Sequence, residues 1–188
     1  MYICNIINKK DMNIITLKFK VLLPTFITIM LCCSIISCKQ NYNEATKKEN
    51  AEVILKDYGP EPLVLDIEDY TEANNNFRTA LWTGTNLQLT LMSIPVGGEI
   101  GLELHSDIDQ FIRIEEGKGK VLMGDSKESL TFNAIAEDDY AIIIPAGKWH
   151  NLINIGDKPL KLYSIYSPVE HPHNTIHKTF EESEAAHH

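Results

Sequence analysis

GGEIGLELHSDIDQFIRIEEG, residues 97–117, is the stretch that decides the fold, and PAGKWHNLIN, residues 145–154, complements it. Glu103 and His105 lie two residues apart in a run typical of a β-strand, so their side chains leave the same face of a sheet. His150 supplies a second imidazole from the second stretch. Carboxylate and imidazole groups that converge on one point are typical metal ligands. The two stretches therefore predict a metal site.

The sequence around these stretches has the pattern of an all-β domain. Leu87, Leu89 and Leu91 alternate with other residues in the period of two that is typical of a half-buried strand. Turn-forming residues separate this run from the strands that follow it. We expect those strands at 100–105, 110–114, 120–123, 130–132, 140–144, 151–155 and 160–166. The spacing predicts a closed or double-sheet all-β fold.

Length and charge limit the classes of function. The chain has 188 residues, of which 44% are hydrophobic, which is enough for one domain with a core. After Cys38 there are 13 basic and 25 acidic residues, a net charge of −12. An acidic body repels phosphate backbones, so nucleic acid is excluded as the expected partner. We expect a small-molecule ligand, and a homodimer is left open.

The amino-terminal segment has the layout of a signal peptide. Residues 21–37 are apolar and uncharged, follow Lys18 and Lys20, and end at Cys38. Residues 35–38 resemble a bacterial lipobox, which implies lipidation of Cys38. The alternative is a retained membrane anchor, although 17 residues fall short of the roughly 20 that span a bilayer. Both alternatives predict an exported protein, and the lipobox implies a membrane-anchored lipoprotein of a bacterial cell envelope.

The four cysteines and the flanking segments complete the expected organisation. No cysteine follows Cys38, so no disulfide framework holds the body together. We expect a signal peptide over 1–38 and a tether with an extended arm over 39–76, ending in a short helix within 66–77. The barrel is expected over 77–167. A polar strap that frays at its end is expected over 168–188.

The second stretch resembles a motif of the cupin superfamily of small β-barrels. Pro145, Gly147, His150 and Asn154 match the proline, glycine, histidine and asparagine of the family's second motif at the family's intervals. The resemblance implies a single cupin-type double-stranded β-barrel, or jelly roll, with an amino-terminal extension. Asp139 departs from the motif, since a glycine commonly stands at that position.

The first stretch resembles the family's first motif in part. The usual motif has His-x-His, then a glutamate and a glycine, and the same positions here hold Glu103, His105, Gln110 and Gly117. The carboxylate has thus moved to the first position, and a neutral oxygen donor stands at the third. Gly98 lies one residue early for the motif.

The resemblance implies that Glu103, His105, Gln110 and His150 bind a divalent transition metal. Imidazole and carboxylate ligands suit Mn, Fe, Ni, Co or Zn, and the sequence does not choose among them. Two alternatives remain open. Gln110 can instead hydrogen-bond a bound water or substrate, and Asp107 or Asp109 can bind the metal in a shifted register, at spacings that the family does not use.

Two tryptophans and two arginines are weaker candidates for the site. Trp82 and Trp149 can line a ligand pocket, but aromatic residues of this size in β-barrels belong more often to the core. Arg78 and Arg113, the two arginines of the chain, can bind a carboxylate or phosphate group of a substrate. We expect surface ion pairs for both of them.

Three histidines near the end of the chain point to a subfamily and to a class of function. His171, His173 and His177 resemble the closing segment of a bacterial cupin subfamily that is similar to mannose-6-phosphate isomerase, where they cover the barrel mouth; an exposed tail is the alternative. The resemblance implies action on a small polar molecule, a sugar or an organic acid, by an isomerase-like enzyme. A non-catalytic binding or sensing cupin of the cell envelope is the competing hypothesis, because fold does not fix chemistry.

Overall fold

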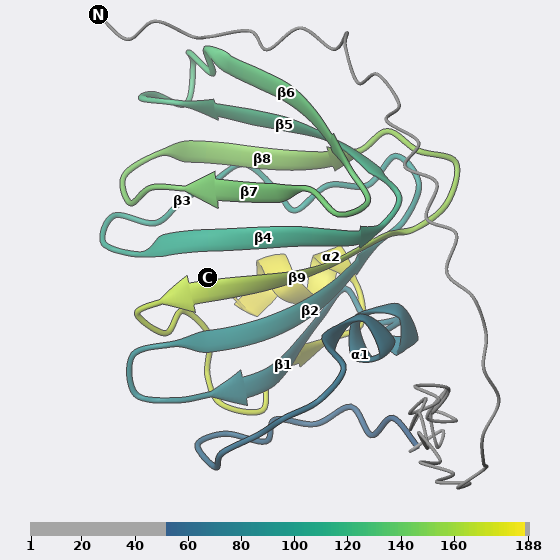
Figure 1. Ribbon diagram of the computed structural model, residues 1–188. Helices are drawn as coiled ribbons and strands as arrows, with labels where there is room; N and C mark the ends of the chain where they lie inside the picture. Colours follow the sequence, from purple (N-terminus) through teal and green to yellow (C-terminus); the bar gives the residue numbers. More distant parts are fainter. Residues whose placement is uncertain (1–51, 187–188) are drawn as a thin grey trace, which may run out of the picture. The chain divides into compact units, whose positions relative to one another are not determined.

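Two antiparallel sheets pack face to face around an apolar core (Figure 1). The computed structural model describes residues 52–186. This architecture confirms the predicted all-β fold of the jelly-roll type. The predicted signal peptide, with Cys38, lies outside the described residues.

The larger sheet has six strands in the order β10-β1-β2-β9-β4-β7. Sequence neighbours are thus interleaved with strands from the far end of the chain, as a jelly roll requires. Its strands are β1 (Arg78–Thr83), β2 (Gln88–Ile94), β4 (Asp109–Glu116), β7 (Ala141–Ile144), β9 (Leu160–Ser167) and β10 (Ile176–His177).

The smaller sheet has four strands in the order β3-β8-β5-β6. It contains β3 (Glu103–Leu104), β5 (Lys118–Gly124), β6 (Phe132–Glu137) and β8 (Trp149–Asn154). Glu103 on β3 pairs in register with His150 on β8, and Met123 on β5 pairs with His150 from the other side. The register of this sheet therefore brings the two quoted stretches of sequence together.

Alternation along the strands builds the core between the sheets. On β9, Leu160, Leu162, Ser164 and Tyr166 are buried and point to the same side of the strand. Burial of the apolar members of such rows is the main favourable contribution to folding. The core cluster consists of Phe77, Met92, Ile94, Ile100, Ile112, Ile114, Val121, Met123, Ala136, Ile142, Ile144, Leu152, Leu160 and Leu162.

An extended arm precedes β1 and runs beside it, as expected for residues 52–65. The amide of Tyr58 donates to the carbonyl of Leu81 at 2.8 Å, and Trp82 Nε1 donates to the carbonyl of Glu61 at 2.8 Å. Helix α1 (Ile67–Ala73) follows the arm and is shorter than the expected 66–77. It ends before the asparagines that follow it, which favour turns over helix interiors.

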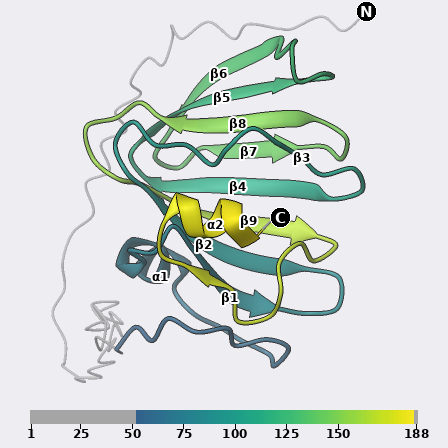
Figure 2. The same cartoon turned by 180° about the vertical axis from the view of Figure 1, so that it is seen from behind.

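The carboxyl-terminal segment is more ordered than the sequence predicts. Residues expected to form a fraying strap make β10, at the edge of the larger sheet, and helix α2 (Phe180–Ala186). Figures 1 and 2 show α1 and α2 on opposite faces of the larger sheet. Phe180 anchors α2, because its ring packs edge-on against Phe77 at 5.6 Å and against the core cluster. An aromatic anchor in an otherwise polar segment is a weak signal in a single sequence.

The largest differences between the expected and the observed strands are at four places. β1 and β10 were not expected, because the buried polar residues of β1 obscure its apolar pattern. The strand expected at 130–132 begins only at Phe132 and continues to Glu137. The strand expected at 100–105 is reduced to two residues, since Gly101 adopts a φ of 96° that interrupts it.

Among residues 52–186, no helix has both the length and the apolar character needed to cross a bilayer.

Candidate metal centre

Three of the four predicted ligands meet between the two sheets. Glu103 Oε1 lies 3.2 Å from His150 Nε2 and 3.4 Å from His105 Nε2. One ligand atom from each of the three residues lies within 4.8 Å of the other two. His150 is buried, and Glu103 and His105 are only partly exposed. A single cation can therefore contact all three side chains.

Backbone contacts fix the positions of these side chains. The pairing of β3 with β8 sets Glu103 opposite His150. The amide of Gly147 donates to the carbonyl of His105 at 2.7 Å, which ties the end of the first motif to the turn of the second. Gly147 has a φ of 77°, a conformation that glycine adopts without strain. The glycine of the second motif thus helps to place a ligand of the first.

The orientation of the His150 ring favours a cation at this point. Its Nδ1 lies 2.9 Å from the carbonyl oxygen of Lys148, which can only accept a hydrogen bond. A neutral imidazole that donates from Nδ1 presents a lone pair at Nε2. That lone pair faces a Glu103 carboxylate oxygen, so two acceptors oppose each other. A shared proton or metal ion relieves the repulsion, and only the metal can be shared by all three side chains.

The electrostatics of the cluster hold Glu103 in its charged form. Burial alone would raise the pKa of Glu103, but the neighbouring imidazoles of His105 and His150 and the charge of Arg78 lower this pKa well below its usual range. Burial likewise would lower the pKa of His105, but the neighbouring carboxylates of Glu103 and Glu170 raise it. The carboxylate is therefore available as a ligand at neutral pH.

Gln110, the fourth predicted ligand, also lies in the interior. Its side chain is 2% exposed, and its Nε2 donates to Ser164 Oγ at 3.0 Å. Its Oε1 has no hydrogen-bond partner among the described residues. On the neighbouring strand its register partner is Tyr166, whose ring packs edge-on against His105 at 5.9 Å. A buried acceptor without a partner costs free energy, which a metal or a ligand would recover.

The alternative ligands of the first motif lie outside the cluster. Asp107 and Asp109 are exposed, and one oxygen of Asp109 accepts from the amide of Ala146 at 2.9 Å. Asp109 thus stabilises the turn before β8. The shifted register with an aspartate ligand is not observed.

Two further expectations were wrong. Trp82 and Trp149 are partly exposed and do not belong to the core; Lys127 lies over the Trp149 ring at 5.5 Å. Arg78 is 1% exposed instead of forming a surface ion pair. Arg113, by contrast, forms the expected surface pair, with Asp139.

Tyr166 and Glu170 lie beside the centre, although the sequence did not identify them as site residues. His171, whose position the sequence left open, lies there too. Tyr166 packs between His105 and His171, and its ring lies 5.2 Å from that of His171. Glu170 Oε1 lies 3.5 Å from His105 Nδ1. His171 is 4% exposed, which answers the open question for this residue of the tail, whereas His173 is exposed. The inward alternation on β9 is the signal that could have identified Tyr166.

Comparison with known proteins decides the family. Residues 90–166 match the family model described as Cupin domain. YrkC of Bacillus subtilis is 55% identical over 138 residues, which make up 73% of this chain and 74% of YrkC. The chain belongs to the cupin superfamily.

Two further proteins are similar to this chain. The crystal structure of BH2720 from Bacillus halodurans is 57% identical, with a TM-score of 0.69, and the match covers 69% of this chain and 98% of BH2720. Protein L612 of Acanthamoeba polyphaga mimivirus is 39% identical over 114 residues, 60% of this chain and 69% of its own length.

Cupins commonly bind a divalent metal, and the residues of this cupin fit one. The fit rests on the facing acceptors of Glu103 and His150 and on the buried oxygen of Gln110, which has no hydrogen-bond partner within residues 52–186. Oxygen and imidazole donors together suit a first-row transition metal. The departure at Asp139 does not disturb the barrel, because its φ of 68° is the left-handed conformation that glycine adopts at such turns.

Proposed function

We propose that the protein is an exported, lipid-anchored metal-binding cupin that acts on a small polar molecule, a sugar or an organic acid, with isomerase-like chemistry. The metal-binding part of this proposal is supported most strongly by the convergence of Glu103, His105 and His150 within 4.8 Å. If Gln110 binds the small molecule and not the metal, the three side chains leave coordination positions of the metal open for that molecule.

A divalent metal bound at this centre would supply a Lewis acid that polarises a carbonyl or hydroxyl group. The chain's own side chains then hold and orient the ligand. Burial raises the pKa of Tyr166, so its phenol keeps its proton at neutral pH and can donate to a ligand oxygen. Gln110 Oε1 can accept from a ligand hydroxyl group. Glu170 orients the ring of His105 through Nδ1.

A non-catalytic binding or sensing cupin is the second candidate, and Gln110 is the observation that favours it. An amide is too weak a base to accept a proton at neutral pH, so the position that usually carries a glutamate cannot serve as a general base here. The same side chain can still bind a ligand, which is all that a sensor or carrier needs.

One experiment separates the two candidates. The full chain is prepared with and without bound metal and mixed with a panel of sugars and small organic acids. Calorimetry measures binding, and NMR measures conversion. His150→Ala serves as the matched control that lacks a ligand. Metal-dependent conversion supports the enzyme, and metal-dependent binding without conversion supports the sensor. Neither binding nor conversion by the metal-loaded wild type would contradict both.

The lipid anchor has a separate test, because Cys38 lies outside the described residues. Mass spectrometry of the mature amino terminus measures its mass directly. We expect a chain that begins at a diacylated Cys38, and Cys38→Ala should remain unprocessed. An intact leader on the wild type would contradict the proposal of a lipoprotein but not that of the metal centre.

A further inference from the structure

A buried glutamine holds the backbone of the segment that follows β9. Gln88, the first residue of β2, is 0% exposed. Its Nε2 donates to the carbonyl of His171 at 2.8 Å, and its Oε1 accepts from the amide of His171 at 2.8 Å. The same Nε2 also donates to Thr83 Oγ1 at 2.9 Å. Each polar atom of the Gln88 side chain thus has a protein partner, and two of its three hydrogen bonds fix one residue.

The segment held in this way brings two side chains to the metal centre. Glu170 Oε1 lies 3.5 Å from His105 Nδ1. The ring of His171 packs edge-on against that of Tyr166 at 5.2 Å, and the Tyr166 ring lies 5.9 Å from that of His105. Glu170 directly precedes the residue that Gln88 holds. A shift of the backbone at His171 would therefore move the Glu170 carboxylate away from His105.

The position of Gln88 in the larger sheet makes it a fixed anchor. Its register partner on β9 is Tyr166, whose register partner on β4 is Gln110. All three side chains are buried and form one row across three paired strands. The segment between β9 and β10, by contrast, belongs to no strand. Its place beside the centre therefore depends on side chains that hold it.

The carboxylate of Glu170 matters because His105 needs a partner on its second ring nitrogen. A histidine that binds a metal through one nitrogen usually donates from the other, and the acceptor sets the orientation and basicity of the ring. At His105, Nε2 faces Glu103 at 3.4 Å, which leaves Nδ1 for such an acceptor. Glu170 supplies it from outside both motifs.

We propose that Gln88 is a positioning residue of the metal centre: by holding His171, it keeps the Glu170 carboxylate beside Nδ1 of His105. This inference rests on the proposed metal centre and goes beyond it, because it assigns the support of one ligand to a residue of neither motif. Gln88 acts through Glu170 and does not touch the metal.

A double-mutant cycle tests whether Gln88 acts through Glu170. Calorimetry measures the affinity of the full chain for Co²⁺ in wild type, Gln88→Leu, Glu170→Ala and the double variant. Glu170→Ala should lower this affinity about 10- to 100-fold, and Gln88→Leu about tenfold, because loss of the partner of a metal-bound histidine has effects of this size. Gln88→Leu should cause little further loss once Glu170 is absent. Independent losses that multiply in the double variant would overturn the inference.

The visible absorption spectrum of bound Co²⁺ gives a readout that a general loss of stability would not change. Gln88→Leu and Glu170→Ala should shift its bands in the same direction, since both release the His105 ring. Gln88→Asn keeps the amide but is shorter by one methylene group, so it should lie between wild type and Gln88→Leu. It carries the same cycle if Gln88→Leu does not fold, which urea denaturation checks.

Asp57→Asn is the matched control for a structural role. Asp57 holds a farther part of the same segment, since its carboxylate accepts from the amide of Asn174 at 3.1 Å. The substitution should lower stability but leave the Co²⁺ affinity and spectrum as in wild type. Equal losses of Co²⁺ affinity in Asp57→Asn and Gln88→Leu would overturn the specific role of Gln88.

The outcomes separate this inference from the proposed metal centre. A wild type that binds Co²⁺ with an affinity and spectrum that Gln88→Leu does not change overturns the inference alone. A wild type that holds no metal contradicts the metal centre, and NMR of the metal-free protein then tests the link itself. Gln88→Leu and Glu170→Ala should change the resonances of the His105 imidazole nitrogens in the same way. Unchanged resonances in Gln88→Leu would overturn the link as well.

Discussion

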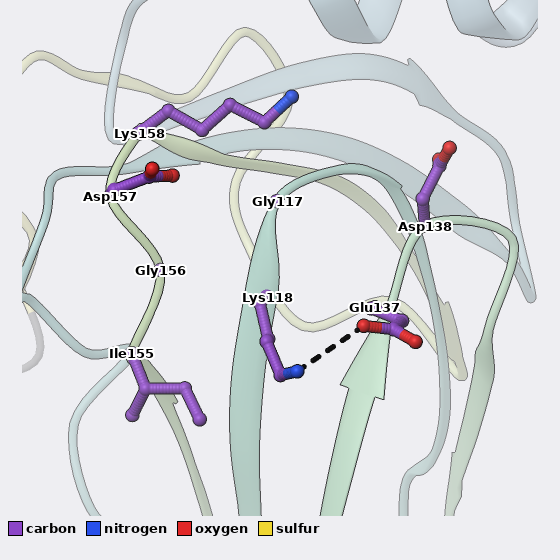
Figure 3. Close-up of a pocket in the computed structure, with 8 residues that line it drawn as sticks. All are labelled: Gly117, Lys118, Glu137, Asp138, Ile155, Gly156, Asp157 and Lys158. Atoms are coloured by element: carbon purple, nitrogen blue, oxygen red, sulfur yellow. Dashed lines mark ion pairs between the residues drawn. The ribbon is translucent and has the colours of Figure 1, made fainter.

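Charged side chains gather at both ends of strand β8, but the two ends differ in burial. Near its start, His150 faces Glu103 with a side chain that is 1% exposed. Beyond its last residue, a hollow of about 550 Å³ is lined by residues 117–118, 137–138 and 155–158 (Figure 3). There Lys118 and Glu137 form an ion pair at 3.4 Å, and both side chains are about half exposed.

The two ends teach that the burial of the charged side chains, and not the volume of a neighbouring hollow, indicates where a metal can bind. Water screens the pair at the far end, so each partner is already solvated and gains little from the other. At the near end the carboxylate and imidazole groups have lost water and must find partners in one another or in a cation. We therefore expect the two ends to respond differently to the same kinds of substitution.

The largest expected effect is on metal affinity. His150→Ala should lower the affinity for Co²⁺ or Mn²⁺ by more than about 100-fold, because it removes one of only a few ligands. Equilibrium dialysis or calorimetry measures this change. His173→Ala, which removes an exposed histidine of the tail, is the matched control and should bind like wild type. Equal affinities for the two variants would place the metal elsewhere.

Asp57 tests whether a buried carboxylate outside the centre is purely structural. Its side chain is fully buried and accepts hydrogen bonds from the amides of Gly59, Thr83 and Asn174 and from the Thr83 hydroxyl group. Asp57→Asn should lower the free energy of unfolding by about 1–3 kcal/mol, measured by urea denaturation. Metal affinity should not change. A loss of metal binding would show that Asp57 also supports the metal centre and is not purely structural.

The stability difference between wild type and Asp57→Asn should depend on pH with a defined sign. Burial would raise the pKa of Asp57, but its hydrogen bonds, led by that from Thr83, lower it below the ordinary value. In the unfolded chain the pKa of an aspartate is about 3.9, and in the folded protein the pKa of Asp57 is lower. The ionised carboxylate therefore stabilises the folded state fully above the unfolded pKa, and this stabilisation is lost as the pH falls through the folded pKa. The difference should stay constant from about pH 8 to about pH 5 and shrink below about pH 4. A difference that grows on acidification would be evidence against this account.

A smaller effect is expected at Gln110. Gln110→Leu removes the buried Oε1 and should weaken metal binding about tenfold if that oxygen is a ligand. Gln110→Glu keeps the oxygen and adds a charge, so it should bind the metal at least as tightly as wild type. The same dialysis measures both variants. If both bind metal as wild type does, Gln110 is not a metal ligand.

The smallest effect is expected at the far end of β8. Lys118→Met removes one partner of the half-exposed pair and should change the free energy of unfolding by less than about 1 kcal/mol. Metal affinity should not change. A large loss of stability, measured by urea denaturation, would show that exposure does not set the strength of these pairs.

The sequence predicted the fold class because strand alternation and turn residues are local signals. Leu87, Leu89 and Leu91 indicated the strand that became β2, although it begins only at Gln88 and ends at Ile94. Motif spacing also brought together Glu103, His105 and His150, since the intervals along the chain reflect the register of β3 with β8. That part of the site could be predicted without coordinates.

The environment of the site could not be predicted, because it depends on contacts between distant segments. Arg78 and Ser183 are 105 residues apart and meet only after α2 has folded against the larger sheet. Nothing near Arg78 in the sequence distinguishes it from Arg113, which is a surface residue. Tyr166 and His171 likewise became neighbours of the centre only through the fold.

The metal content of the purified wild-type protein tests the central claim most directly. The full chain is stripped with a chelator, reconstituted with each of Mn²⁺, Fe²⁺, Co²⁺, Ni²⁺ and Zn²⁺, desalted and measured by elemental analysis. We predict one equivalent of at least one of these metals in the wild type and none in His105→Ala combined with His150→Ala. A folded wild type that retains none of the five metals would contradict the assignment of Glu103, His105 and His150 as a metal centre.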